Sequence, residues 1–290
     1  MKMKTKSTLL VSMLGSLVLA ACGGGGGGGS STPTAQSAST PATASAPAAA
    51  SAPALTGEAL PSLTAPQAGS TAATGNGSEG IWTQTGTTNM TAFVDPASNL
   101  SYINGLFTVV TSTFFGTIAP AAPNWTLTTG FETSLGGIRY TATSGSGTFT
   151  ANQVLNGSYV ANGNTVNLTL KYDPANALAV TQSSVAGTWA QSSTTLTVDD
   201  AGGFTGSILG CGVSGTLALT TPGSSKNLYT MTVSGTTSTC TLRSGVTYSG
   251  NAAITFLPVS GSTTLYKRTV VYLIKAADNS VIGYGQVTKQ

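Results

Sequence analysis

Apolar and polar residues alternate with a period of two along much of the chain after Gly80. The segments 166–172, 213–219 and 229–233 each place apolar residues on one parity and mainly small or polar residues on the other. Successive side chains of a β-strand point to opposite faces, so this spacing predicts half-buried antiparallel strands. Because no helical period of apolar residues occurs in this region, we expect its fold to be all-β.

The region also contains an internal repeat, which predicts its domain organisation. Two segments of the first half recur in the second: Gly80-Ile81-Trp82-Thr83-Gln84 as Gly187-Thr188-Trp189-Ala190-Gln191, and Val94-Asp95 as Val198-Asp199. We therefore expect two tandem modules, residues 80–183 and 184–290. Each has the length of a small antiparallel β-barrel or a compact β-sandwich. Closure into a barrel removes exposed strand edges, which favours the barrel.

Cys211 and Cys240 are the only cysteines in the predicted modules. An even pair in an exported protein predicts a disulfide bond. A metal site is the competing interpretation, but the chain has no histidine and no further cysteine near this pair. The sequence therefore predicts neither a bound metal nor another cofactor.

The N-terminus has the pattern of a secretion signal. Lys2, Lys4 and Lys6 precede an apolar run over residues 9–21, which is too short to span a membrane as a helix. The run ends in Leu19-Ala20-Ala21-Cys22, which resembles the lipobox of bacterial lipoproteins. This resemblance implies that residues 1–21 are a cleaved signal peptide and that Cys22 carries the acyl chains that anchor the protein to a membrane.

Residues 22–79 are predicted to form the lipid anchor and a disordered tether. Gly23–Gly29 is an unbroken glycine run, and Ala, Ser, Thr and Pro dominate the rest, so this segment has too little apolar surface to fold alone. Polyglycine after the lipidated cysteine resembles certain surface lipoproteins of Gram-negative bacteria. Gly23 also departs from the aspartate that retains lipoproteins at the inner membrane. Both features imply the outer membrane, with the periplasmic face and the cell surface left open.

The tether contains one candidate modification site, Pro47-Ala48-Ala49-Ala50-Ser51-Ala52-Pro53. This stretch is similar to the Ala/Ser/Pro-rich acceptor sites of bacterial O-oligosaccharyltransferases. The resemblance implies glycosylation at Ser51 first and Ser45 second. Ordinary linker composition is the alternative.

The repeated Gly-x-Trp, with Trp82 and Trp189, resembles the opening strand of lipocalins and related small barrels. In such barrels the tryptophan plugs one end of a ligand cavity. A core tryptophan of any β-domain is the alternative. Arg139 and Arg243 lie at matching repeat positions, so they could stack on the two indoles and close the barrels, or could be solvated charges at strand ends.

Several catalytic chemistries are excluded by the composition. Without histidine, the usual activation of Ser or Cys nucleophiles and the commonest general base are missing. Glu132 is the carboxylate that lies within a predicted strand, whereas the aspartates lie in turn sequences. A glycosidase would need a second carboxylate facing it. The sequence therefore predicts a protein that is not an enzyme.

Removal of residues 1–21 leaves eight Lys and Arg against eight Asp and Glu, which provides no basic patch for nucleic acid. Together these features predict a lipoprotein of the outer membrane that binds a host or envelope macromolecule. A carrier of a small apolar ligand and an envelope scaffold are the alternatives. The expected partners are the membrane, through acylated Cys22, and a protein, a glycan or a small apolar ligand.

Overall fold

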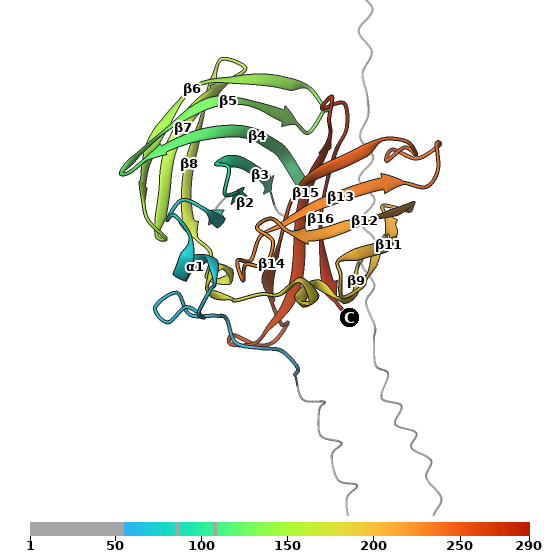
Figure 1. The fold of residues 1–290 in the computed structure, drawn as a ribbon. Coiled ribbons are helices and arrows are strands. Elements are labelled where there is room, and N and C mark those ends of the chain that lie inside the picture. The colour runs from blue at the N-terminus through green and yellow to red at the C-terminus, as the bar shows by residue number, and fades with distance from the viewer. Residues whose placement is uncertain (1–54, 85–87, 107–108) are drawn as a thin grey trace, which may run out of the picture. The chain divides into compact units, whose positions relative to one another are not determined.

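A computed structural model describes residues 55–84, 88–106 and 109–290 (Figure 1). In this part of the chain, two antiparallel sheets of eight strands each close into a barrel. The first barrel closes where Trp82 pairs with Tyr172, and the second where Lys289 pairs with Trp189. The predicted all-β fold with two tandem barrel modules is confirmed, and closure decides between the barrel and the sandwich.

The first barrel runs in simple up-and-down order from β1 to β8. Its strands are β1 (Gly80–Gln84), β2 (Asn89–Val94), β3 (Asn99–Leu106), β4 (Val109–Ala121), β5 (Asn124–Ser134), β6 (Arg139–Thr150), β7 (Val154–Ala161) and β8 (Asn164–Tyr172). Two short 3-10 helices, η1 (Pro174–Ala177) and η2 (Gln182–Val185), connect it to the second barrel.

The second barrel repeats this order from β9 to β16, as the internal repeat predicts. Its strands are β9 (Gly187–Gln191), β10 (Thr194–Val198), β11 (Gly203–Ile208), β12 (Cys211–Leu219), β13 (Tyr229–Gly235), β14 (Thr247–Pro258), β15 (Tyr266–Ala276) and β16 (Ile282–Lys289). The repeated aspartates occupy equivalent turns. Asp95 Oδ1 accepts hydrogen bonds from the backbone N–H groups of Ala97 and Asn99, and Asp199 Oδ1 accepts those of Ala201 and Gly203.

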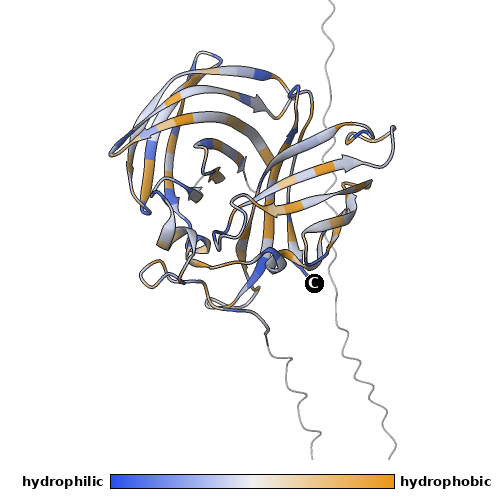
Figure 2. Ribbon diagram, viewed as in Figure 1, coloured by the Kyte–Doolittle hydropathy of each residue, from blue (hydrophilic) through white to orange (hydrophobic). Residues whose placement is uncertain are grey.

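A cluster of buried apolar side chains lies inside each barrel. Most of the alternating strand positions that point inward are apolar, and Figure 2 shows the alternating hydropathy along the strands. The first interior is rich in buried aromatic residues: Trp82, Tyr102, Phe114, Trp125, Phe149, Tyr159 and Tyr172. The second contains Trp189, Phe204, Tyr229, Tyr248 and Tyr272 among aliphatic side chains.

The outer faces of the barrels share a third apolar cluster, within the compact unit 53–290. It joins outward-facing residues of β1, β2 and β4 to residues of η1, β14 and β15 and to Leu228. Strands in this contact are covered on both faces, so residues 270–274 of β15 are buried without a break. A strand buried on both sides loses the polar half of the alternation.

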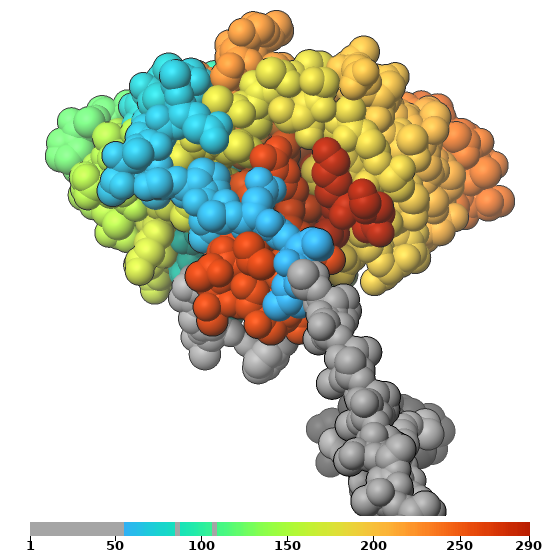
Figure 3. All heavy atoms as spheres, turned by 90° about the horizontal axis from the view of Figure 1, so that it is seen from below, coloured from blue at the N-terminus to red at the C-terminus, as the bar shows by residue number. Residues whose placement is uncertain are grey.

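Residues 55–79 pack against the barrels, which corrects the prediction that the tether extends to residue 79. Glu58 pairs with Tyr266, the first residue of β15, and Gly77 O accepts a hydrogen bond from the backbone N–H of Asn152 in the first barrel. This segment includes the short helix α1 (Thr71–Thr74). Figure 3 shows the segment in blue, lying against both barrels. Backbone hydrogen bonds to existing structure order it despite its low apolar content.

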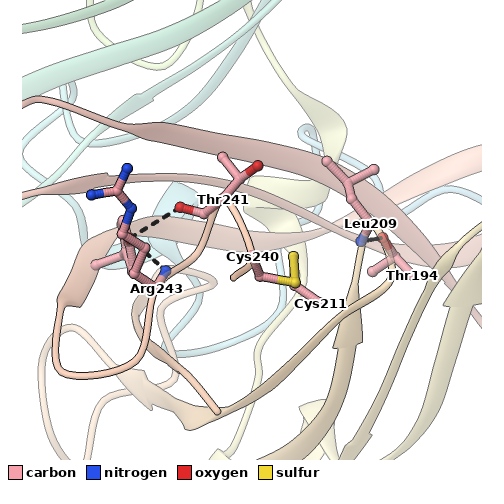
Figure 4. The surroundings of a disulfide bond; sticks show 7 residues. Thr194, Leu209, Cys211, Cys240, Thr241 and Arg243 are labelled. Atoms are coloured by element: carbon pink, nitrogen blue, oxygen red, sulfur yellow. Dashed lines mark hydrogen bonds between the residues drawn. A yellow bond between two sulfur atoms is a disulfide. The ribbon is translucent and has the colours of Figure 1, made fainter. Parts of the chain in front are cut away.

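The predicted disulfide between Cys211 and Cys240 is confirmed, with Cα atoms 5.7 Å apart. It ties loop 236–246 to the start of β12, as Figure 4 shows. Leu242 of this loop is buried in the interior of the second barrel. The corresponding loop of the first barrel has only four residues, 135–138. A loop held by the disulfide therefore covers the second barrel at this end, and the described residues of the first barrel include no equivalent loop.

Candidate functional site

Three residues predicted to carry modifications, Cys22, Ser45 and Ser51, lie outside the described residues. Acylation of Cys22 and glycosylation of the two serines therefore stay predictions.

Trp82 and Trp189 lie at equivalent positions in the two barrels, each in the opening strand. Both side chains are fully buried. Trp82 Nε1 donates to Ser78 O at 2.9 Å, and Trp189 Nε1 donates to Val185 O at 2.7 Å. The ring of Trp82 also packs edge-on against Tyr172. These contacts favour the interpretation as core tryptophans, because each indole is hydrogen-bonded and buried among core side chains.

Neither Arg139 nor Arg243 stacks on a tryptophan in the part of the chain that the structure describes, contrary to one of the two expectations. Arg139 instead lies over Phe131, with Cζ 5.7 Å from the ring centroid. Its Nη1 donates across to the second barrel, to the backbone oxygens of Asp278 and Asn279, each at 3.3 Å.

Arg243 lies in loop 236–246, where its backbone N–H donates to the Tyr248 hydroxyl at 3.0 Å. Lys289 takes the predicted place over Trp189, with Nζ 5.5 Å from the ring centroid. The two arginines also differ from each other in setting, because Arg139 begins β6 whereas Arg243 lies in a loop. The β13–β14 loop is longer than the β5–β6 loop, so matching positions in the sequence are not equivalent in space.

Glu132 points into the first barrel. Its strand neighbours across the sheet are Phe114, which is a core residue, and Tyr140. Its Oε2 accepts a hydrogen bond from the Tyr159 hydroxyl at 3.1 Å, and that hydroxyl also contacts the hydroxyl of Tyr102. Burial raises the pKa of both tyrosines well above the usual value, so these hydroxyls are neutral donors. Glu132 thus faces a phenol rather than the second carboxylate that glycoside hydrolysis needs.

A cleft of about 750 Å³ lies between the outer faces of the two barrels. Strands β3–β6 form one wall, and β13–β15 form the other. Hydroxyl and amide side chains dominate these walls: Ser101, Thr117, Thr129, Thr141, Thr230, Ser249 and Asn251. Such side chains both donate and accept hydrogen bonds.

Two phenylalanines and two cations meet in this cleft. The rings of Phe115 and Phe131 stack with centroids 5.6 Å apart. Lys275 Nζ lies 5.5 Å from the Phe115 centroid and 6.0 Å from the Phe131 centroid, and Arg139 approaches Phe131 from the first barrel. Asn279, at the β15–β16 turn, accepts hydrogen bonds from both cations. Its backbone oxygen accepts from Arg139 Nη1, and its Oδ1 accepts from Lys275 Nζ at 2.6 Å.

The positive charge of the cleft is only weakly compensated. Among the described residues, ion pairs join Glu58 to Arg268 and Glu79 to Lys226, whereas Arg139 and Lys275 lie within ion-pair distance of no carboxylate. Burial lowers the pKa of Lys275, and the charge of Arg139 lowers it further.

Two aspartates lie near these cations. Asp95 lines the cleft, but its carboxylate accepts three hydrogen bonds from its own turn. Asp278 is fully exposed; hydrogen bonds from Ser280 lower its pKa, and the charge of Arg139 lowers it slightly further. The cleft therefore presents two cations whose remaining N–H groups are available to an anion.

A second hollow, of about 530 Å³, shares Arg139 and Asn279 with the cleft. Its lining includes Leu135 and Tyr284, which are 67% and 38% exposed. Arg139 therefore borders both hollows, and it is the one candidate binding residue from the sequence that lies in the cleft.

Lys275, Asn279, Phe115 and Phe131 were not predicted as site residues. The alternation along β15 gives part of the information needed to find Lys275. Lys275 lies on the same face of the strand as Val271 and Leu273, which pack against the first barrel. That signal becomes readable only once the contact between the barrels is known.

In the described part of the chain, no group of three or more Cys, Asp and Glu side chains is placed to hold a metal ion. None of the helices in this part has the length and apolar character needed to cross a membrane. No protein-family model, curated protein or solved structure matches this chain.

Proposed function

We propose that this chain is a lipoprotein of the outer membrane, anchored through acylated Cys22, which acts without catalysis by binding a host or envelope macromolecule. We place the binding site in the cleft between the barrels. The observation that carries this proposal is the pair of cations, Arg139 and Lys275, that converge there without a carboxylate partner. Burial partly desolvates Lys275, and a partly desolvated cation without a carboxylate partner is costly, which favours a role in binding.

The apolar cores inside the barrels support binding on the outer surface over carriage of a small apolar ligand. A carrier needs an apolar cavity beneath Trp82 or Trp189. Both indoles instead contact core side chains, and the surrounding aromatic residues are buried against one another.

The packed segment 55–79 shortens the proposed tether to residues 23–54. Fully extended, this length of chain reaches roughly 110 Å. That reach is enough for the barrels to meet a partner away from the membrane surface.

Two experiments test the two parts of this proposal. For the anchor, radiolabelled palmitate should enter the wild-type chain but not the variant Cys22→Ser, and that variant should leave the envelope fraction. For the cleft, a photo-crosslinking residue at Thr141 should capture a macromolecule on intact cells. The same residue at Thr197, exposed on β10 outside the cleft, is the matched control.

Capture from Thr141 should disappear when Arg139→Gln and Lys275→Gln are combined. Equal capture from Thr141 and Thr197, or capture that survives the double substitution, would refute the cleft as the binding site. Palmitate incorporation into Cys22→Ser would refute the anchor.

A further inference from the structure

The donors that remain free on the two cations indicate what the cleft can bind. Arg139 uses Nη1 for two backbone oxygens, and its Nε and Nη2 have no acceptor among the residues the structure describes. Lys275 uses one of its three N–H bonds on Asn279. A guanidinium can hold a carboxylate or sulfate through two parallel hydrogen bonds, and an ammonium adds a point charge. This pair therefore suits an oxyanion.

The walls of the cleft suit a ligand rich in hydroxyl groups. Thr129, Thr141 and Ser249 are exposed, and within the described residues their hydroxyls form no hydrogen bond. Asn251 Nδ2 donates to Ser101 Oγ, which leaves the Asn251 carbonyl as a further acceptor. Sugar hydroxyls both donate and accept, so they match walls of this kind.

The dimensions of the cleft favour a slender ligand over a folded protein. Its volume of about 750 Å³ is within the range of small-ligand pockets. A stable protein partner buries roughly 800 Å² on each side and needs a broader surface with apolar anchors. Here Lys275 already lies over both phenylalanine rings.

We infer that the cleft binds an acidic oligosaccharide, that is, a short carbohydrate chain whose carboxylate or sulfate groups lie between Arg139 and Lys275. This inference rests on the proposed function and names the ligand class of the same site. The lowered pKa of Lys275 is consistent with it, because a bound anion would offset both causes of that shift.

Calorimetric titration of the mature chain in detergent tests this inference. The probes are a tetrasaccharide of hexuronic acid, a sulfated tetrasaccharide and a neutral glucose tetrasaccharide. We expect one or both acidic probes to bind at least tenfold more tightly than the neutral one, and added salt to weaken this binding. An acidic peptide and vesicles containing anionic phospholipid are tested in parallel as rival sources of negative charge.

Three variants locate the binding. Combined Arg139→Gln and Lys275→Gln should weaken acidic-probe binding by roughly tenfold or more for each charge removed. Asn279→Asp keeps both cations but adds a carboxylate beside them, and it should also weaken binding. Lys267→Gln removes an equal charge from an exposed position of β15 outside the cleft, so it should change affinity less than twofold.

Binding of the neutral probe as tightly as the acidic ones would overturn the inference. Unchanged affinity in the double variant, or tighter binding of the peptide or vesicles, would do the same. If Thr141 still captures a partner while both acidic probes fail, the ligand class is wrong and the proposed function survives. If Thr141 captures no more than the control position Thr197 in the otherwise unaltered protein, the proposed function itself is refuted.

Discussion

Arg139 in the first barrel and Asn279 in the second are joined across the cleft, because Arg139 Nη1 donates to the Asn279 backbone oxygen at 3.3 Å. The Asn279 side chain also accepts from Lys275, so one turn residue holds the cations of both barrels. Asn279 has a φ of +59°, a left-handed conformation that Asn adopts more readily than most residues. The charge of the cleft thus depends on how the barrels meet.

The first prediction concerns the pKa of Lys275. Burial and the charge of Arg139 both lower this pKa, in that order of size. Arg139→Gln should therefore raise it only part of the way to the ordinary value, because the effect of burial remains. Titration of the lysine ¹³Cε signals by NMR measures the change. Arg243→Gln is the control and should leave Lys275 unaffected, whereas an unchanged pKa in Arg139→Gln would contradict the assigned cause.

The two ion pairs of the N-terminal segment should differ in their effect on stability. Glu79 is only 3% exposed and Lys226 is 19% exposed, whereas Glu58 and Arg268 are 39% and 30% exposed. Lys226→Met would leave the Glu79 charge buried and unpaired, and it should lower the free energy of unfolding by about 3–5 kcal/mol. Adding Glu79→Gln should recover much of this loss. Arg268→Met should cost at most about 1 kcal/mol.

Urea denaturation of the four proteins, wild type included, provides these free energies. If Lys226→Met and Arg268→Met lowered the free energy of unfolding equally, the difference in burial between the two ion pairs would not determine their contributions to stability.

The disulfide should stabilise the loop that covers one end of the second barrel. Its closed loop of about 30 residues corresponds to about 3.6 kcal/mol in the chain-entropy description. Replacing Cys211 and Cys240 together with serine should lower stability by up to that amount. Hydrogen exchange followed by mass spectrometry should show the loss of protection first in loop 236–246, around Leu242. Protection lost equally in both barrels would contradict a local role.

Asp173 should contribute a pH dependence in the acid range. Burial raises its folded-state pKa, although the backbone N–H of Ala175 partly opposes the shift. A raised pKa means that the folded state binds its proton more tightly than the unfolded state. The stabilising contribution is therefore fully present below the unfolded pKa, near 3.9, and is lost as the pH rises through the folded value.

Asp173→Asn keeps an oxygen that can accept from Ala175 but removes the titration. Denaturant unfolding between pH 3 and pH 7 should then show wild-type stability falling relative to the variant as the pH rises. A constant difference across this range would exclude Asp173 as the titrating group.

The elements that were predicted correctly depend on local patterns. Alternation over residues 166–172 and 229–233 predicted strands that the structure contains as β8 and β13. The repeated Gly-x-Trp located the opening strands β1 and β9 of both barrels. The disulfide followed from counting, because only Cys211 and Cys240 remain after Cys22.

Residues 55–79 show where composition misleads. Their Ala, Ser, Thr and Pro content resembles that of the tether, and composition measures only what a segment can bury by itself. Glu58 is instead ordered by backbone pairing with Tyr266 and by two hydrogen bonds to Arg268. These partners lie more than 200 positions away in the chain, and no local pattern connects them.

The cleft shows most clearly the difference between what a local pattern predicts and what only the tertiary structure decides. Alternation decides which residues of a strand point outward, because the side chains of a strand change face at every residue. It cannot decide which outward faces meet. Arg139, Lys275 and the two phenylalanines come together only because the apolar outer faces of β4 and β15 pack against each other, and that contact between barrels exists only in the tertiary structure.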